Sequence, residues 1–191
     1  MINPLGDWVL DRACQQISTR NAQRSEGQAL YVSVNLSSMQ LFEKELLDTV
    51  SQAMVGHQVA PGQLKLELTE SLLVDDNPQV VELMNQLRVL GCGILVDDFG
   101  TGYSSLSYLQ RFPIDTLKID QSFVARLGQD SGRHLVSAII AMARALELDV
   151  IAEGVETQDA AQQLLTLGCE LGQGYYFARA LPVDQATRFL G

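Results

Sequence analysis

The chain has 191 residues, of which 47% are hydrophobic and 19% are charged, the composition of a single folded domain. Thirteen basic side chains against 23 acidic ones give a formal net charge of -10, which excludes electrostatic binding of a DNA or RNA polymer. No apolar run approaches the ~20 residues of a membrane span, and no signal-peptide pattern follows Met1. We therefore expect a cytoplasmic domain without membrane contact.

Short β-rich segments alternate with helical ones at a period of about 30 residues, the length of a βα unit. An opening helix carries Trp8, Val9, Cys14 and Ile17. The predicted strands cover residues 31–36, 64–68, 94–97, 116–120, 150–153 and, with a weaker pattern, 170–173. Helical spacing of apolar residues follows over 42–54, 80–90 and 135–146. Strands separated by helices predict a parallel sheet, either open or closed into a barrel.

Several predicted strands have one polar face, which decides between these two architectures. In the segment 64–68, three leucines alternate with Lys65 and Glu67. Strands of an open parallel sheet are buried on both faces and should be nearly continuous apolar runs. A barrel explains the polar face, because one face meets the helices and the other meets the barrel axis. We therefore predict an α/β fold of the (β/α)8 TIM-barrel type.

The three cysteines give no sign of a metal or redox site. Cys14, Cys92 and Cys169 lie far apart in the sequence, beside apolar residues and without ligand-like spacing. We expect them to be buried thiols.

Polar side chains stand at the carboxyl ends of most predicted strands, the edge where α/β folds build their sites. They are Asn35, Glu67, Asp97 with Asp98, Lys118 with Asp120, Glu153 and Gln173. Converging carboxylates repel one another unless a cation lies between them, so we infer a divalent metal site. Oxygen ligands favour Mg²⁺ or Mn²⁺, and adjacent aspartates allow one carboxylate to bridge two ions about 4 Å apart. Neither His57 nor His134 lies at a strand end, which argues against zinc or Ser-His catalysis.

Each of these residues, taken singly, also has a purely structural interpretation. Glu67 and Glu70 fit the entry to a solvated loop, and the adjacent aspartates fit a turn cap. Lys118 and Asp120 fit a structural ion pair, and Glu156 fits an exposed carboxylate beside a helix start. The joint interpretation is favoured because all these groups fall at the same end of successive strands.

Six ordered motifs together resemble the EAL domains, which hydrolyse the bacterial second messenger cyclic di-GMP. The motifs are SVNLS at 33–37, ELTES at 67–71, DDFGTGYSSL at 97–106, LKID at 117–120, AEGVET at 152–157 and QGY at 173–175. The resemblance implies a (β/α)8-type barrel with one antiparallel strand. It also implies cleavage of one phosphodiester of cyclic di-GMP to linear pGpG with two Mg²⁺ or Mn²⁺ ions.

The resemblance assigns roles to individual residues. It makes Asn35, Glu67 and Asp97 ligands of the first metal, and Asp97 with Asp98 ligands of the second. The residue roles at the reacting groups follow in the same way.

By the same resemblance, Lys118 contacts the bridging water or the phosphate, and Glu153 is the candidate general base. The supporting groups are Asp120, Glu156 and Gln173, with Glu70 as an anchor for the loop 98–106. Guanine stacking and core packing stay open as alternatives for Phe177.

The chain departs from the family by omission. Complete EAL domains open with two further strands, the second carrying the Glu-Ala-Leu signature, whereas this chain begins in the helix that follows them. We therefore expect residues 1–191 to be a single, incomplete EAL domain with about six βα units. On this view it is a fragment of a longer protein or pairs with another copy, is inactive alone, and forms a homodimer through the loop after Asp98. The alternative function is a catalytically inactive module that binds cyclic di-GMP or partner proteins.

Overall fold

The computed structural model describes residues 2–24, 29–73, 77–102 and 109–190 of the 191-residue chain. Its elements alternate along the chain as the sequence predicts. The strands are β1 (Val32–Asn35), β2 (Leu64–Thr69), β3 (Gly93–Phe99), β4 (Thr116–Ile119), β5 (Asp149–Ala152) and β6 (Leu171–Gly172). The helices are α1 (Ile2–Gln23), α2 (Ser38–Leu41), α3 (Leu46–Gly56), η1 (Glu70–Leu73), α4 (Pro78–Val89), α6 (Gln121–Val124), α7 (Asp130–Ala145), α8 (Gln158–Leu167) and α9 (Val183–Leu190).

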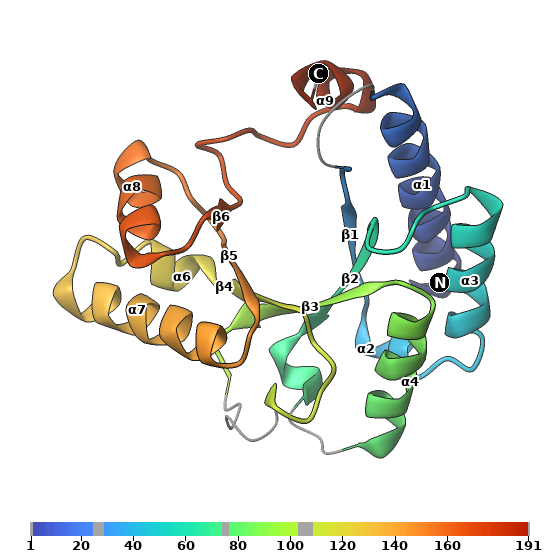
Figure 1. Ribbon diagram of the computed structural model, residues 1–191, viewed down its shortest axis with the longest axis horizontal. Coiled ribbons are helices and arrows are strands. Elements are labelled where there is room, and N and C mark those ends of the chain that lie inside the picture. The colour runs from blue at the N-terminus through green and yellow to red at the C-terminus, as the bar shows by residue number, and fades with distance from the viewer. Residues whose placement is uncertain (1, 25–28, 74–76, 103–108, 191) are drawn as a thin grey trace.

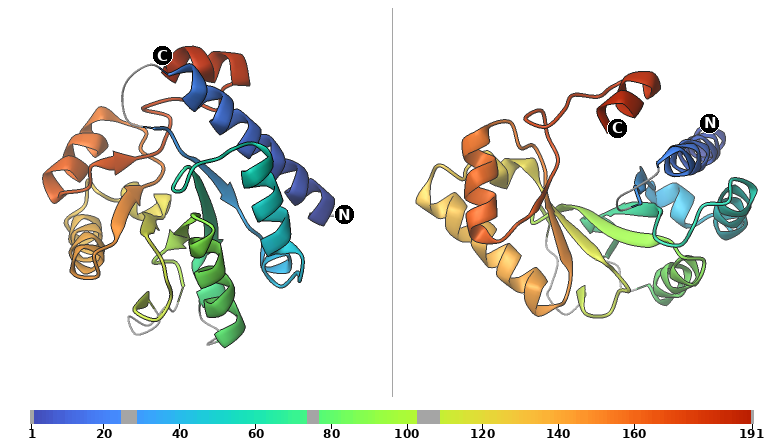
Figure 2. Two further views of the ribbon diagram at one scale, coloured as in Figure 1. Left: turned by 45° about the vertical axis from the view of Figure 1, so that its right-hand side comes forward. Right: turned by 45° about the horizontal axis from the view of Figure 1, so that its top comes forward.

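The strands form one sheet in the order β1-β2-β3-β4-β5-β6, with every neighbouring pair parallel. The sheet curls into a half-barrel whose helices lie on its convex side (Figures 1 and 2). The fold prediction, an incomplete α/β barrel, is therefore confirmed. Because all strands run the same way, their carboxyl ends meet at one rim of the half-barrel.

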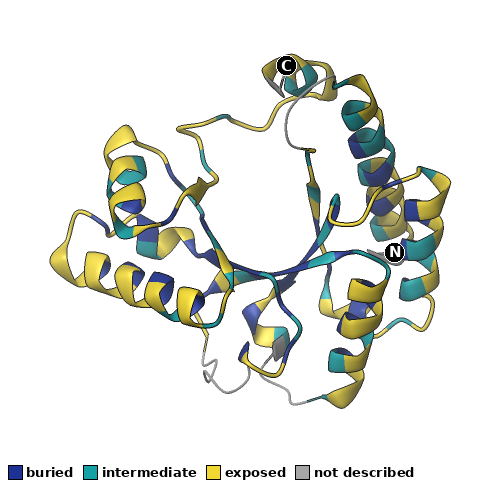
Figure 3. Ribbon diagram, in the orientation of Figure 1, coloured by how far each residue is buried: buried dark blue, intermediate teal, exposed yellow. Residues whose placement is uncertain are grey.

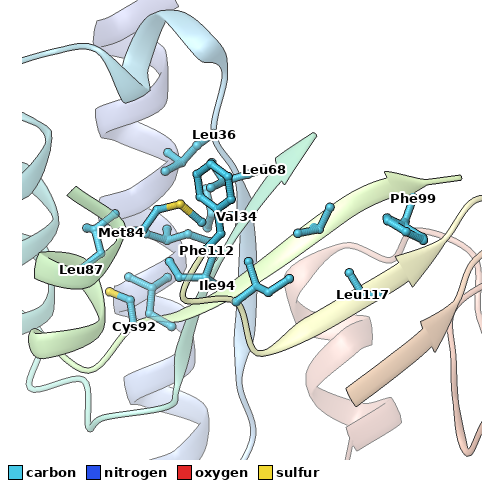
Figure 4. Packing of buried hydrophobic residues seen from close by; sticks show 14 of the residues in the cluster. Val34, Leu36, Leu68, Met84, Leu87, Cys92, Ile94, Phe99, Phe112 and Leu117 are labelled. Atoms are coloured by element: carbon cyan, nitrogen blue, oxygen red, sulfur yellow. The ribbon is translucent and has the colours of Figure 1, made fainter. Parts of the chain in front are cut away.

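The alternation within the strands produces the two faces of the sheet. Leu64, Leu66 and Leu68 of β2 are fully buried and join the hydrophobic core beneath the helices. Figure 4 shows part of this core, where Met84 and Leu87 of α4 pack against strand residues. The residues between the leucines point to the concave face, where no helix covers them. The helix-facing side of the sheet is buried (Figure 3), and so are Glu67 and Lys118 on the concave side.

Capping residues mark both ends of α8. The Thr157 hydroxyl accepts a hydrogen bond from the Ala160 amide at 3.1 Å, and Gly168 ends α8 in a left-handed conformation at φ 88°. Trp8 and Val9 depart from the predicted apolar pattern of α1. Both are exposed, and α1 packs through Leu10, Cys14 and Ile17 instead.

The three cysteines are free and buried, so the buried-thiol prediction is confirmed. Burial raises the pKa of Cys14 to about 11 and that of Cys92 to about 12, which keeps both thiols protonated at neutral pH. None of the helices in the described ranges is long and apolar enough to cross a membrane.

Candidate active site

Lys118 lies at the centre of the carboxylates that the strands bring to the rim. Its Nζ donates to Glu67 Oε2 at 2.6 Å and to Asp97 Oδ1 at 2.9 Å, and pairs with Glu153 Oε1 at 2.6 Å. These partners come from β2, β3 and the end of β5, on either side of β4. The lysine side chain is only 4% exposed, so solvent screens these ion pairs little. The structure therefore brings together four of the predicted site residues by direct contact.

The electrostatics of the cluster reflect a surplus of negative charge. Burial lowers the pKa of Lys118, but its hydrogen bonds to Glu153, Glu67 and Asp97 outweigh burial and leave that pKa above its ordinary value. Burial raises the pKa of the Glu153 carboxyl, although Lys118 opposes the shift. Burial, with Asp97 beside it, likewise raises the pKa of Asp98. One ammonium thus faces more carboxylates than it can neutralise.

A local irregularity turns two adjacent aspartates into the site. Successive residues of a regular strand point to opposite faces, but the β3–β4 register shifts between Val96 and Phe99. Within this bulge Asp98 adopts a left-handed backbone at φ 54°, uncommon for a residue other than glycine. One carboxylate oxygen from each of Asp97, Asp98 and Glu153 then lies within 4.8 Å of the other two. The adjacent aspartates therefore do more than cap a turn.

The donor set of the cluster fits a hard divalent cation. The groups at the rim are carboxylates, with the side chain of Asn35 at the end of β1, in register with Glu67. Mg²⁺ and Mn²⁺ prefer such oxygen donors, and no histidine or cysteine belongs to the cluster within the described ranges. Asn35 is exposed at the rim, paired with Glu67 in the β1–β2 register. Its proposed role as a ligand stays a prediction.

Asp120 is buried beside the cluster but does not pair with Lys118 in the described contacts. Instead it caps α6: its Oδ1 accepts a hydrogen bond from the Ser122 amide at 3.1 Å and from the Ser122 hydroxyl at 2.5 Å. Ser122 was not among the residues that the sequence analysis singled out. The Asp-x-Ser spacing before a short helix, a capping pattern, was the available signal.

Glu70 links the end of β2 to the loop after Asp98. Its Oε2 accepts hydrogen bonds from the amides of Gly100 at 2.8 Å and Gly102 at 3.2 Å. Glu67 and Glu70 are both buried, so their interpretation as a solvated loop entry is wrong. Residues 103–108 of the loop, through which we expect dimerisation, lie outside the described part of the chain.

The structure does not bring the remaining predicted residues into the cluster. Gln173 is exposed and lines a cavity of about 200 Å³ that Glu67 and Lys118 also line. Glu156 is exposed and lines a different groove, between α6 and α8. Phe177 is 47% exposed and stands edge-on to Tyr176, with ring centroids 5.2 Å apart. Its two predicted roles therefore stay open.

Proteins with similar sequences include two cyclic di-GMP phosphodiesterases of one bacterium. The chain is 42% identical over 187 residues to the bifunctional diguanylate cyclase/cyclic di-GMP phosphodiesterase MucR of Pseudomonas aeruginosa, covering 97% of the chain and 27% of MucR. It is also 42% identical over 191 residues to the cyclic di-GMP phosphodiesterase NbdA of the same organism, covering 100% of the chain and 24% of NbdA. The chain thus spans about a quarter of the length of these relatives.

Solved structures show the same fold. The MucR phosphodiesterase in complex with c-di-GMP superimposes with a TM-score of 0.89 at 42% identity, covering 97% of this chain and 74% of the other. The EAL domain of Mycobacterium smegmatis DcpA gives a TM-score of 0.91 at 38% identity, covering 97% and 83%. The family model of the EAL domain matches residues 1–180. The half-barrel, its acidic rim and these similarities together show that the chain belongs to the EAL domain family.

Proposed function

We propose that this chain forms the catalytic rim of a metal-dependent phosphodiesterase that hydrolyses cyclic di-GMP to linear pGpG in a bacterial signalling pathway. The observation that carries the proposal is the cluster of Glu67, Asp97 and Glu153 around Lys118, with Asp98 turned into it. An acidic protein does not attract a phosphodiester anion by itself. A rim that gathers carboxylates would attract it through bound cations.

In this proposal two Mg²⁺ or Mn²⁺ ions, when bound, lower the pKa of the attacking water and neutralise the phosphate oxygens. Asn35, Glu67 and Asp97 would hold one ion, and Asp97 with Asp98 would hold the other. The Lys118 Nζ lies 2.6 Å from Glu67 Oε2 and 2.9 Å from Asp97 Oδ1, which supports a role for this ammonium beside the ions. There it would contact the water or a phosphate oxygen.

We assign to Glu153 the role of general base, which accepts the proton of the attacking water. A general base works best when its pKa lies nearer the working pH than that of an ordinary carboxylate, and burial shifts Glu153 in that direction. A water would add to phosphorus as one P–O3′ bond breaks. Glu153 would accept the proton that the water loses, and the departing O3′ would take up a proton from solvent, which leaves pGpG with a free 3′-hydroxyl. The supporting roles remain with Asp120, Glu156, Gln173 and Glu70.

The test is a hydrolysis assay with the protein as it is made in the cell, in Mn²⁺ or Mg²⁺, following pGpG by chromatography. We expect turnover by the wild type, and its loss in Glu153→Gln with cyclic di-GMP binding retained. Binding without any pGpG from the wild type would contradict the enzyme and support the inactive binding module. Dimerisation through the loop after Asp98 is a separate proposal, tested by the oligomeric state in solution.

A further inference from the structure

A buried glutamine outside the acidic cluster has no role in the chemistry proposed above. Gln40, on α2, is only 6% exposed, although α2 follows the exposed strand end of β1 directly. Its Oε1 accepts hydrogen bonds from the Ser37 hydroxyl at 2.8 Å and the Ser37 amide at 3.2 Å. The backbone amide of Gln40 donates in return to Ser37 Oγ at 3.3 Å. This is a complete capping box, which fixes the direction in which the chain leaves β1.

The capping box lies two residues beyond Asn35, and the residue between them is also fixed. The Leu36 amide donates to the Glu67 carbonyl at 2.9 Å, which continues the β1–β2 ladder past Asn35. The Leu36 side chain is 3% exposed and belongs to the core. The backbone of Asn35 is therefore held on one side by the ladder and on the other by the turn that Gln40 closes.

Helix α1 supports the glutamine from behind. A Cβ atom on Gly6 would lie 1.8 Å from Gln40 Nε2. The start of α1 therefore contacts the side-chain amide of Gln40 directly. The side chain cannot move toward α1, and its oxygen is held by Ser37. Ser37 thus binds the Gln40 side-chain oxygen, while Gly6 of the sequence-distant helix α1 lies against its nitrogen.

We propose that Gln40 is a positioning residue for Asn35, setting the place of the Asn35 side chain relative to a bound divalent cation. The inference rests on the proposed function, because it takes Asn35 as a ligand. Mutating a residue that supports a metal ligand typically lowers the metal affinity by roughly 10- to 100-fold. Gln40 acts in this way through the backbone turn instead of through a contact with the ligand side chain.

The test is Mn²⁺ affinity, measured by electron paramagnetic resonance on the protein as it is made in the cell. Gln40→Met keeps the length and removes the acceptor, and we expect it to weaken Mn²⁺ binding about tenfold. Gln40→Glu keeps the acceptor, since glutamate suits this position of a capping box, and should bind Mn²⁺ nearly as the wild type does. Gln52→Met makes the same chemical change at an exposed site on α3 and serves as the matched control.

A double-mutant cycle separates positioning from a general loss of stability. In the background Asn35→Ala, Gln40→Met should weaken Mn²⁺ binding no further. An unchanged affinity of Gln40→Met, or an equal loss in both backgrounds, would overturn the proposal. If Gln40→Met does not fold, Ser37→Ala replaces it, and its expected loss of affinity should be reversed in Ser37→Thr. A wild type that binds no Mn²⁺ would instead contradict the proposed function itself.

Discussion

Replacing Lys118 by methionine removes the cation from the centre of the acidic rim. The side chain keeps its approximate volume, but Glu67, Asp97 and Glu153 lose contacts of 2.6 to 2.9 Å. Glu67 is as buried as the lysine, and the other two carboxylates are 15% and 17% exposed. Removing one partner of such a buried pair destabilises a protein by about 3–5 kcal/mol. With a urea m value of about 3 kcal/mol/M, the unfolding midpoint of the metal-free protein should fall by about 1–1.7 M.

The dependence of this loss on pH follows from Glu153. Without the opposing lysine, burial raises the folded-state pKa of Glu153 further above its ordinary value of 4.5. The folded protein then keeps a proton that the unfolded chain releases, so stability falls as pH rises through this interval. The loss caused by Lys118→Met should therefore be larger at about pH 8 than at about pH 5.

Urea titrations in EDTA measure this effect, with Lys65→Met as the control. Lys65 lies on β2, on the same face of that strand as Glu67. Its Nζ is 3.9 Å from the centre of the Tyr31 ring. Its loss should destabilise the protein by only about 0.5–1 kcal/mol. Excess Mn²⁺ should restore more stability to Lys118→Met than to the wild type, because the ion replaces the missing positive charge. A loss no greater than that of Lys65→Met would refute the account of the rim as a carboxylate cluster that requires a cation.

Three further outcomes are expected. Asp98→Gly should stabilise the metal-free fold by about 1 kcal/mol, because it removes the backbone strain of the left-handed conformation at φ 54°. The same variant should bind Mn²⁺ more weakly. A variant that urea titrations show to be destabilised would contradict the claim that Asp98 is strained. Glu70→Ala should destabilise the protein by about 1–3 kcal/mol and speed hydrogen exchange at the Gly100 and Gly102 amides; unchanged exchange would exclude Glu70 as the loop anchor. The raised pKa values of Asp98 and Glu153 mean that these groups stabilise the metal-free fold below their ordinary values of 3.8 and 4.5 and lose that contribution as pH rises above them. Glu153→Gln should flatten this part of the urea-measured pH profile, and an unaltered profile would contradict the assignment.

The architecture could be predicted from the sequence because strand alternation and helix caps are visible within short segments. The alternation of leucines with Lys65 and Glu67 shows which face of β2 meets the helices, and parallel strands then place their polar ends at one rim. Thr157 and Gly168 mark the ends of α8 by capping chemistry alone. These features need no knowledge of which strand lies beside which.

The details of the site depend on register, which the sequence did not reveal. Lys118 contacts three carboxylates because β4 lies between β3 and β5 at one particular register. From the sequence alone, the nearby Asp120 suggested a simple ion pair with Lys118. The bulge that turns Asp98 inward is a property of the β3–β4 pairing. Trp8 is exposed because α1 packs through Leu10, Cys14 and Ile17, which lie on another face of the helix.

The central claim is that carboxylates from separate strands hold divalent cations in common, and Mn²⁺ anomalous scattering from crystals of the protein tests it most directly. We expect two peaks about 4 Å apart at the rim, one with Asn35, Glu67 and Asp97 as ligands and one with Asp97 and Asp98. A map without peaks at saturating Mn²⁺, with the carboxylates still paired only to Lys118, would contradict the account.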